Sequence, residues 1–207
     1  MKPILFNTEM VRAILEGRKT VTRRVINPQP TYSPRDGFSY KGHAYGTDLP
    51  PTIKGAAYNL CCAAPYKIGD VLYVRETWGD YGDGTPLLYK ADYPDDATTY
   101  KHDDDIHICD LPKWKPSIHM SKAAARIFLR VTSVRVERLQ DIDTADDQEF
   151  FKEGTADKHS FIELWNSTVK NESQGWYGNP YVWVIEFERI EKSEAAVQKG
   201  ATLNVRE

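Results

Sequence analysis

The longest extended pattern in the sequence, residues 126–139, does most to limit how the chain can fold. Its apolar side chains alternate and then change phase halfway along, from Ile127, Leu129 and Val131 to Val134 and Val136. Such a change of phase is typical of a bulge or a sharp bend, and small barrels close through bends of this kind. Residues 181–190, "YVWVIEFERI", form a second strand pattern that is apolar on both sides in its first half, as in a central strand.

Shorter patterns accompany these two strands. Further strands are expected at residues 3–6, 20–25 and 85–93, and a turn followed by a strand is expected within residues 68–78. A first helix begins at Asn7 or Thr8, either of which can cap it, and stops at Gly17. Two more helices are expected, at 143–153 before Gly154 and at 160–169.

Two segments, about 26–67 and 92–116, lack a periodic pattern, and the first is rich in proline. We expect them to be long irregular insertions in a single α+β domain that spans residues 1–190. Residues 191–207 are polar, and we expect them to form a mobile tail.

Composition limits the functional classes. A net charge of −3 excludes nucleic-acid binding through an overall positive field, so any such contact must come from a local patch. The three cysteines are odd in number, with Cys61 and Cys62 adjacent, which favours a reducing compartment over a disulfide framework. The N-terminus has no signal-peptide pattern, and no apolar run approaches the ~18 residues of a membrane helix. We therefore expect a cytoplasmic protein with no membrane partner.

The segment "LEGRKTVTRRV", residues 15–25, is the first candidate site. It is not a phosphate-binding loop, because Arg18 separates Gly17 from Lys19 and the upstream segment reads as a helix. Lys19 and Thr22 flank a helix-to-strand corner, and Arg24 shares the strand face of Thr22. Two interpretations stay open: cations that meet a helix C-terminus, or the lining of a ligand pocket.

The strand pattern at 68–78 carries a second candidate. Leu72, Val74 and Glu76 share one face, so Glu76 lies either in a polar pocket at the end of a core strand or in water. Trp78 follows it and can stack on a nucleobase or anchor the core.

Four segments together resemble the ASCH family, and more narrowly its phage- and prophage-encoded members. They are "ILEGRKTVTRR", "GDVLYVRETW", "FLRVTSVRVERLQDI" before a helix that ends in "KEGT", and the closing "VWVIEFERI". The resemblance implies a PUA-like small mixed β-barrel with flanking helices, a fold that binds RNA. The segments 26–67 and 92–116 exceed the compact core of that family.

Some small bacterial ASCH proteins are amidohydrolases that remove the acetyl group from N4-acetylcytidine, and others look like RNA binders or nucleases. The resemblance implies a Lys and a Thr in a G-x-K-T-x-T segment and a Glu near the end of the helix after the long strand. Here these are Lys19, Thr22 and Glu153, and Arg24 matches the Arg two residues after the Thr.

The implied chemistry uses Thr22 as nucleophile, Lys19 as base and Glu153 as proton carrier. A threonine hydroxyl needs such a base, and lysine serves only when burial or nearby cations lower its pKa from ~10.4. Neighbouring arginines favour this, whereas an ionised Glu153 would oppose it. Arg24 can hold a phosphate, a carboxylate or a developing oxyanion. No cofactor is required.

Two other functions stay open: a non-catalytic RNA-binding module, and a phage interaction protein that keeps the fold without the site. The segment "KHDDDIHICD", residues 101–110, contains metal-ligand residue types without ordinary ligand spacing. We expect it to be a solvated acidic loop and not a metal site. The expected partner is a modified nucleoside or RNA.

Overall fold

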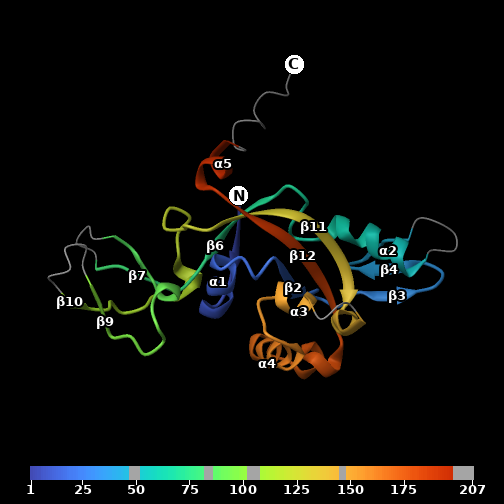
Figure 1. Ribbon diagram of the computed structural model, residues 1–207. Helices are drawn as coiled ribbons and strands as arrows, with labels where there is room; N and C mark the ends of the chain where they lie inside the picture. Colours follow the sequence, from blue (N-terminus) through green and yellow to red (C-terminus); the bar gives the residue numbers. More distant parts are fainter. Residues whose placement is uncertain (47–51, 82–85, 102–107, 145–147, 198–207) are drawn as a thin grey trace, which may run out of the picture. The chain divides into compact units, whose positions relative to one another are not determined.

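The computed structural model describes residues 1–46, 52–81, 86–101, 108–144 and 148–197 (Figure 1). The chain divides into two compact units, each assembled from separate stretches of sequence. Unit 1 consists of Met1–Gly17, Val71–Leu129 and Arg189–Glu207, and unit 2 of Arg18–Asp70 and Arg130–Glu188. Two of the four boundaries between the units fall within the two long strands, β11 (Phe128–Arg138) and β12 (Tyr181–Ile190). The other two lie between residues 17 and 18 and between residues 70 and 71.

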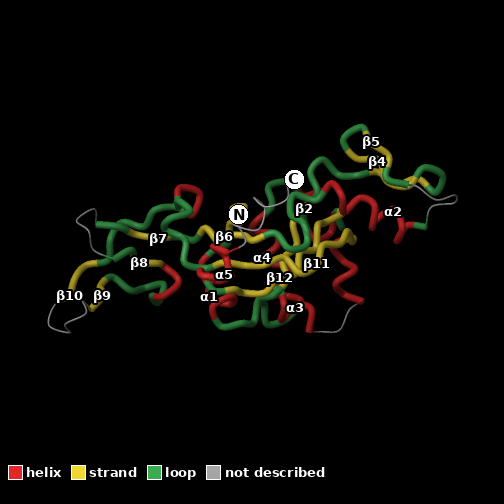
Figure 2. Tube along the Cα trace, turned by 90° about the horizontal axis from the view of Figure 1, so that it is seen from above, coloured by secondary structure: helices red, strands yellow, loops and turns green. Residues whose placement is uncertain are grey.

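Unit 1 is built around a parallel strand pair. β1 (Lys2–Leu5) pairs with β6 (Val71–Arg75), and α1 (Thr8–Leu15) follows β1. The Asn7 side chain caps α1 by accepting a hydrogen bond from the Met10 N–H at 2.9 Å. Two antiparallel pairs and a short helix complete unit 1. β7 (Trp78–Gly79) pairs with β8 (Leu88–Tyr89), and the two lie side by side in Figure 2. β9 (Thr99–Lys101) pairs with β10 (Ile108–Asp110), and the helix is α5 (Lys192–Val197).

Unit 2 holds the antiparallel pair of β2 (Val21–Val25) and β12 and two helices that pack against it. β12 also neighbours β11. α3 (Gln148–Lys152) and α4 (Lys158–Thr168) follow β11. Their aromatic side chains pack with the strand valines in one buried cluster that includes Val21, Val182, Val184, Phe150, Phe161 and Trp165. This cluster fixes α3 against β2, which positions the site described below.

The fold class is confirmed as mixed α+β. The expected helices at residue 8, before Gly154 and at 160–169 are present, as are the long strands. Figure 1 shows β11 as a long curved strand, and its buried positions change parity between Val131 and Val136, as the sequence predicts. No closed barrel is found in the part of the chain that the structure describes, so the PUA-like barrel stays a prediction.

The prediction that 26–67 is irregular is wrong. This segment contains a three-stranded antiparallel sheet and a helix, namely β3 (Thr31–Ser33), β4 (Gly37–Tyr40), β5 (His43–Ala44) and α2 (Ile53–Leu60). Strands of two to four residues are too short to show a period of two, which explains the error. The segment 92–116 likewise contains the β9–β10 pair.

The remaining elements are short. The segment expected to be a mobile tail begins with α5, in which Ala195 is buried, and residues 198–207 lie outside the described ranges. Single turns of 3-10 helix complete the chain at Cys61–Ala63, Lys90–Asp92, Ser117–His119, Glu172–Gln174 and Trp176–Gly178, with a longer one at Leu139–Thr144. Within the described residues, no helix has the length and apolar character needed to cross a bilayer.

Candidate functional site

Lys19 is the most unusual side chain of unit 2, because it is a lysine that is only 2% exposed. Its ammonium donates three hydrogen bonds, to the main-chain oxygens of Val21 (2.8 Å) and Glu153 (2.7 Å) and to Glu153 Oε2 (2.8 Å). Glu153 is also buried, at 4% exposed. Lys19 and Glu153, which are 134 positions apart in sequence, therefore form one buried ion pair.

Residues 18–20, just before β2, also cap the C-terminus of α3. The last carbonyl groups of a helix lack intrahelical partners, and cations are favourable near them. Three consecutive residues donate to three consecutive carbonyl oxygens: Arg18 Nη1 to Gly154 (3.1 Å), Lys19 Nζ to Glu153 (2.7 Å) and the Thr20 N–H to Lys152 (2.9 Å). Gly154 has a φ of +86°, the left-handed turn that commonly follows a helix. The basic corner thus meets a helix C-terminus, but that of α3 instead of α1.

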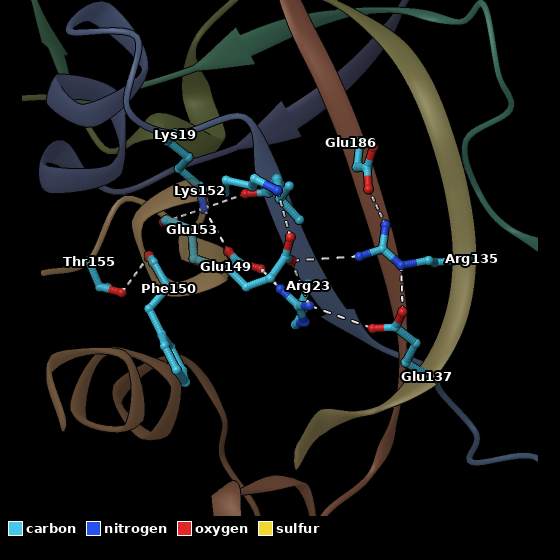
Figure 3. A network of polar contacts seen from close by, with 11 residues as sticks. Lys19, Arg23, Arg135, Glu137, Glu149, Phe150, Lys152, Glu153, Thr155 and Glu186 are labelled. Atoms are coloured by element: carbon cyan, nitrogen blue, oxygen red, sulfur yellow. Dashed lines mark hydrogen bonds and ion pairs between the residues drawn. The ribbon is translucent and has the colours of Figure 1, made fainter. Parts of the chain in front are cut away.

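A second cation holds the other oxygen of Glu153. Arg23 Nη1 donates to Glu153 Oε1 at 2.9 Å, and Arg23 Nη2 lies 3.3 Å from Glu149 Oε2 and 3.5 Å from Glu137 Oε2 (Figure 3). The Arg23 side chain is only 1% exposed. One guanidinium on β2 therefore joins carboxylates from α3, from the residue just after it and from β11.

The network continues toward solvent through Arg135 of β11. Arg135 contacts Glu137 and Glu186 and lies 3.7 Å from Glu149, and Lys152 donates to Glu149 at 2.9 Å (Figure 3). Although burial acts in the opposite direction, the hydrogen bonds from Lys152 and Arg23 lower the pKa of Glu149. The ionised form of Glu149 is therefore stabilised.

Burial changes the proton affinity of Lys19. It lowers the pKa of the ammonium, Glu153 opposes this shift, and the charges of Arg24 and Arg23 reinforce it. A buried amine with a lowered pKa is what general-base chemistry by lysine needs. The carboxylate at 2.8 Å favours the charged form.

Thr22 and Arg24 lie on the other side of the strand from Arg23. Thr22 is opposite Ile185 of β12 and Arg24 is opposite Trp183, and alternation along β2 turns both away from the face that carries Arg23. Thr22 is 2% exposed. The three hydrogen bonds described above for the Lys19 ammonium go to oxygens of Val21 and Glu153, and not to the Thr22 hydroxyl. The segment 26–67 contributes to the Thr22 face, because the positive charge of Arg24 interacts with Tyr66.

Glu76 and Trp78, the other predicted ligand contacts, belong to unit 1. Glu76 is 1% exposed, which excludes the interpretation that it emerges into water. Arg126 binds it bidentately, with Nε to Oε1 and Nη2 to Oε2 both at 3.0 Å, and lies 4.0 Å over the Tyr89 ring. The Lys115 Nζ lies 4.6 Å from the centroid of the Trp78 ring. The Trp78 indole N–H has no hydrogen-bond partner among the described residues.

No group of three or more His, Cys, Asp or Glu side chains within the described ranges could hold a metal ion. The histidine- and aspartate-rich stretch 102–107 lies outside those ranges.

Sequence reasoning missed the residues that complete the network around Glu153, namely Arg23, Arg135, Glu137, Glu149 and Glu186. A signal was present for two of them. Glu149 and Glu153 are four positions apart, which places them on one helix face, and Arg23 shares the strand parity of buried Val21.

The comparisons with known proteins return no relationship. No protein-family model matches the chain, and neither a curated protein nor a solved structure matches it.

Proposed function

We propose that this protein is an ASCH-type, PUA-like nucleoside-recognition protein, and that the corner at Lys19–Arg24 with Glu153 removes the acetyl group from N4-acetylcytidine. The observation that carries the proposal is the buried contact of 2.8 Å between Lys19 Nζ and Glu153 Oε2. Burying an ion pair is costly, and ionisable groups in perturbed environments gather at functional sites.

The proposed reaction is an acyl transfer to the enzyme followed by hydrolysis. Neutral Lys19 accepts the proton of the Thr22 hydroxyl, whose oxygen attacks the acetyl carbonyl. Glu153, in its protonated form, gives a proton to the N4 amine as the amide bond breaks. Water then gives a proton to the Glu153 carboxylate and attacks the acetyl ester, and the Lys19 ammonium returns its proton to the Thr22 oxygen as acetate leaves. Because the three hydrogen bonds of the Lys19 ammonium go to Val21 and Glu153, Lys19 must give up one of them to reach the hydroxyl.

The test is the release of cytidine from N4-acetylcytidine, followed by chromatography. We expect turnover by the wild type, and a loss of at least about 100-fold in Thr22→Ala and in Lys19→Met, since each removes one acting group. Arg130→Gln, which changes a partly exposed arginine elsewhere in unit 2, is expected to keep the wild-type rate. Turnover that survives both active-site substitutions would exclude this mechanism.

A second candidate, a non-catalytic RNA- or nucleoside-binding module, is favoured by the contacts of Lys19. Its three donors are all engaged, and two of its acceptors are main-chain oxygens, as expected of a structural lysine that closes α3. This candidate predicts no cytidine release. It also predicts RNA binding that weakens with salt and is lost in Arg24→Ala.

A further inference from the structure

We infer that Arg23 is a positioning residue of the proposed centre, which holds the Glu153 carboxylate in a fixed orientation against the Lys19 ammonium. The inference rests on the proposed function in one respect, the use of Lys19 as a base. The resemblance on which that function depends gives no role to this position.

The geometry assigns one carboxylate oxygen to each cation. Lys19 Nζ holds Glu153 Oε2 at 2.8 Å, and Arg23 Nη1 holds Oε1 at 2.9 Å. Figure 3 shows the Glu153 side chain between the two cations. Because both carboxylate oxygens are engaged, the orientation of the carboxylate is fixed, and Oε1 cannot also turn toward the Lys19 ammonium.

Arg23 also changes the charge that Lys19 experiences. A carboxylate paired only with an ammonium strongly favours the protonated amine, whereas a second cation on the same carboxylate offsets that effect and repels the ammonium. The charges that act on Lys19 are those of Glu153, Arg24 and Arg23. The ion-pair network around Arg23 adds the cations Arg135 and Lys152 and the carboxylates Glu137, Glu149 and Glu186, and Arg18 contacts the Gly154 carbonyl oxygen next to Glu153. Replacing Arg23 by a neutral residue removes one of the two cations that contact the Glu153 carboxylate.

A purely structural role and a positioning role for Arg23 both predict that its loss destabilises unit 2, because Arg23 joins β2 to α3 and β11. Its Nε–H is buried without a hydrogen-bond partner among the described residues, a cost that packing alone does not explain. Only the positioning role requires the titration of Lys19 to move.

The experiment is a pH titration of the Lys19 side chain by NMR, in protein labelled with ¹³C at lysine Cε and with Lys19→Arg to identify the resonance. In the wild type we expect a pKa below the ordinary value of ~10.4. In Arg23→Gln we expect the pKa of Lys19 to rise by about one pH unit. In Arg23→Lys we expect a smaller rise, because lysine keeps the positive charge but lacks the paired N–H donors of the guanidinium. Arg130→Gln is the matched control, because Arg130 pairs with exposed Glu188 at 2.8 Å; it should leave the titration unchanged.

Activity provides a second readout. A base acts when neutral, so the rate rises with pH through the pKa of Lys19, and a higher pKa moves this limb to higher pH. An unchanged Lys19 titration in folded Arg23→Gln overturns the inference; if that variant does not fold, an unchanged titration in Arg23→Lys does so. If the wild type releases no cytidine, the proposed function fails, while the titration still decides the effect of Arg23 on Lys19.

Discussion

Replacing Glu153 by alanine is expected to lower the free energy of unfolding by about 3–5 kcal/mol. The substitution removes the carboxylate that contacts Lys19 Nζ at 2.8 Å and Arg23 Nη1 at 2.9 Å, and both cationic side chains are almost fully buried. A buried charge that loses its partner keeps its desolvation cost without compensation, which makes this one of the most destabilising changes available in unit 2. Equilibrium unfolding in urea measures the effect.

Glu188→Ala is the matched control for Glu153→Ala. Glu188 pairs with Arg130 at 2.8 Å, but its side chain is 52% exposed. A solvated pair contributes at most about 1 kcal/mol. Equal losses of stability in the two variants would show that the Glu153 network is no stronger than a surface ion pair.

The second large effect is expected in unit 1, on replacing Arg126 by methionine. Glu76 is 1% exposed and depends on the two 3.0 Å contacts from Arg126. Without the guanidinium its carboxylate stays buried and unpaired, so we expect a loss of about 3–5 kcal/mol in the free energy of unfolding. Adding Glu76→Leu should recover much of this loss, because a buried ion pair replaced by apolar side chains is often neutral.

Arg35→Met is the control for Arg126→Met. Arg35 is 3.8 Å from Asp36, and both side chains are largely exposed, so its loss should barely change stability. If Glu76→Leu fails to restore stability to Arg126→Met, the unpaired carboxylate is not the cause of the loss.

Much of the framework could be predicted because local rules determine it. Asn7 caps α1 and Gly17, with a φ of +76°, ends it, and both are recognisable from residue type alone. The strands β6, β11 and β12 show hydrophobic patterns long enough to detect. The strands β3–β5 have two to four residues each, and their pairing depends on turns and on tertiary contacts that no short pattern reveals.

The site could be predicted only in part. Lys19 and Glu153 were singled out through a resemblance, and the structure brings them together. The burial of Glu76 could not be predicted, because it depends on Arg126, fifty positions away in sequence. The same applies to Arg23, whose partners lie on β11, on α3 and at the residue just after α3.

The most direct test of the account is a double-mutant cycle on Lys19→Met and Glu153→Gln, with the free energy of unfolding measured for both single variants and for the double variant. If the two side chains form one buried pair, their effects are not independent, and we expect a coupling energy of about 1–3 kcal/mol. Effects that add to within about 0.5 kcal/mol would contradict the pair, and with it the candidate centre at this corner.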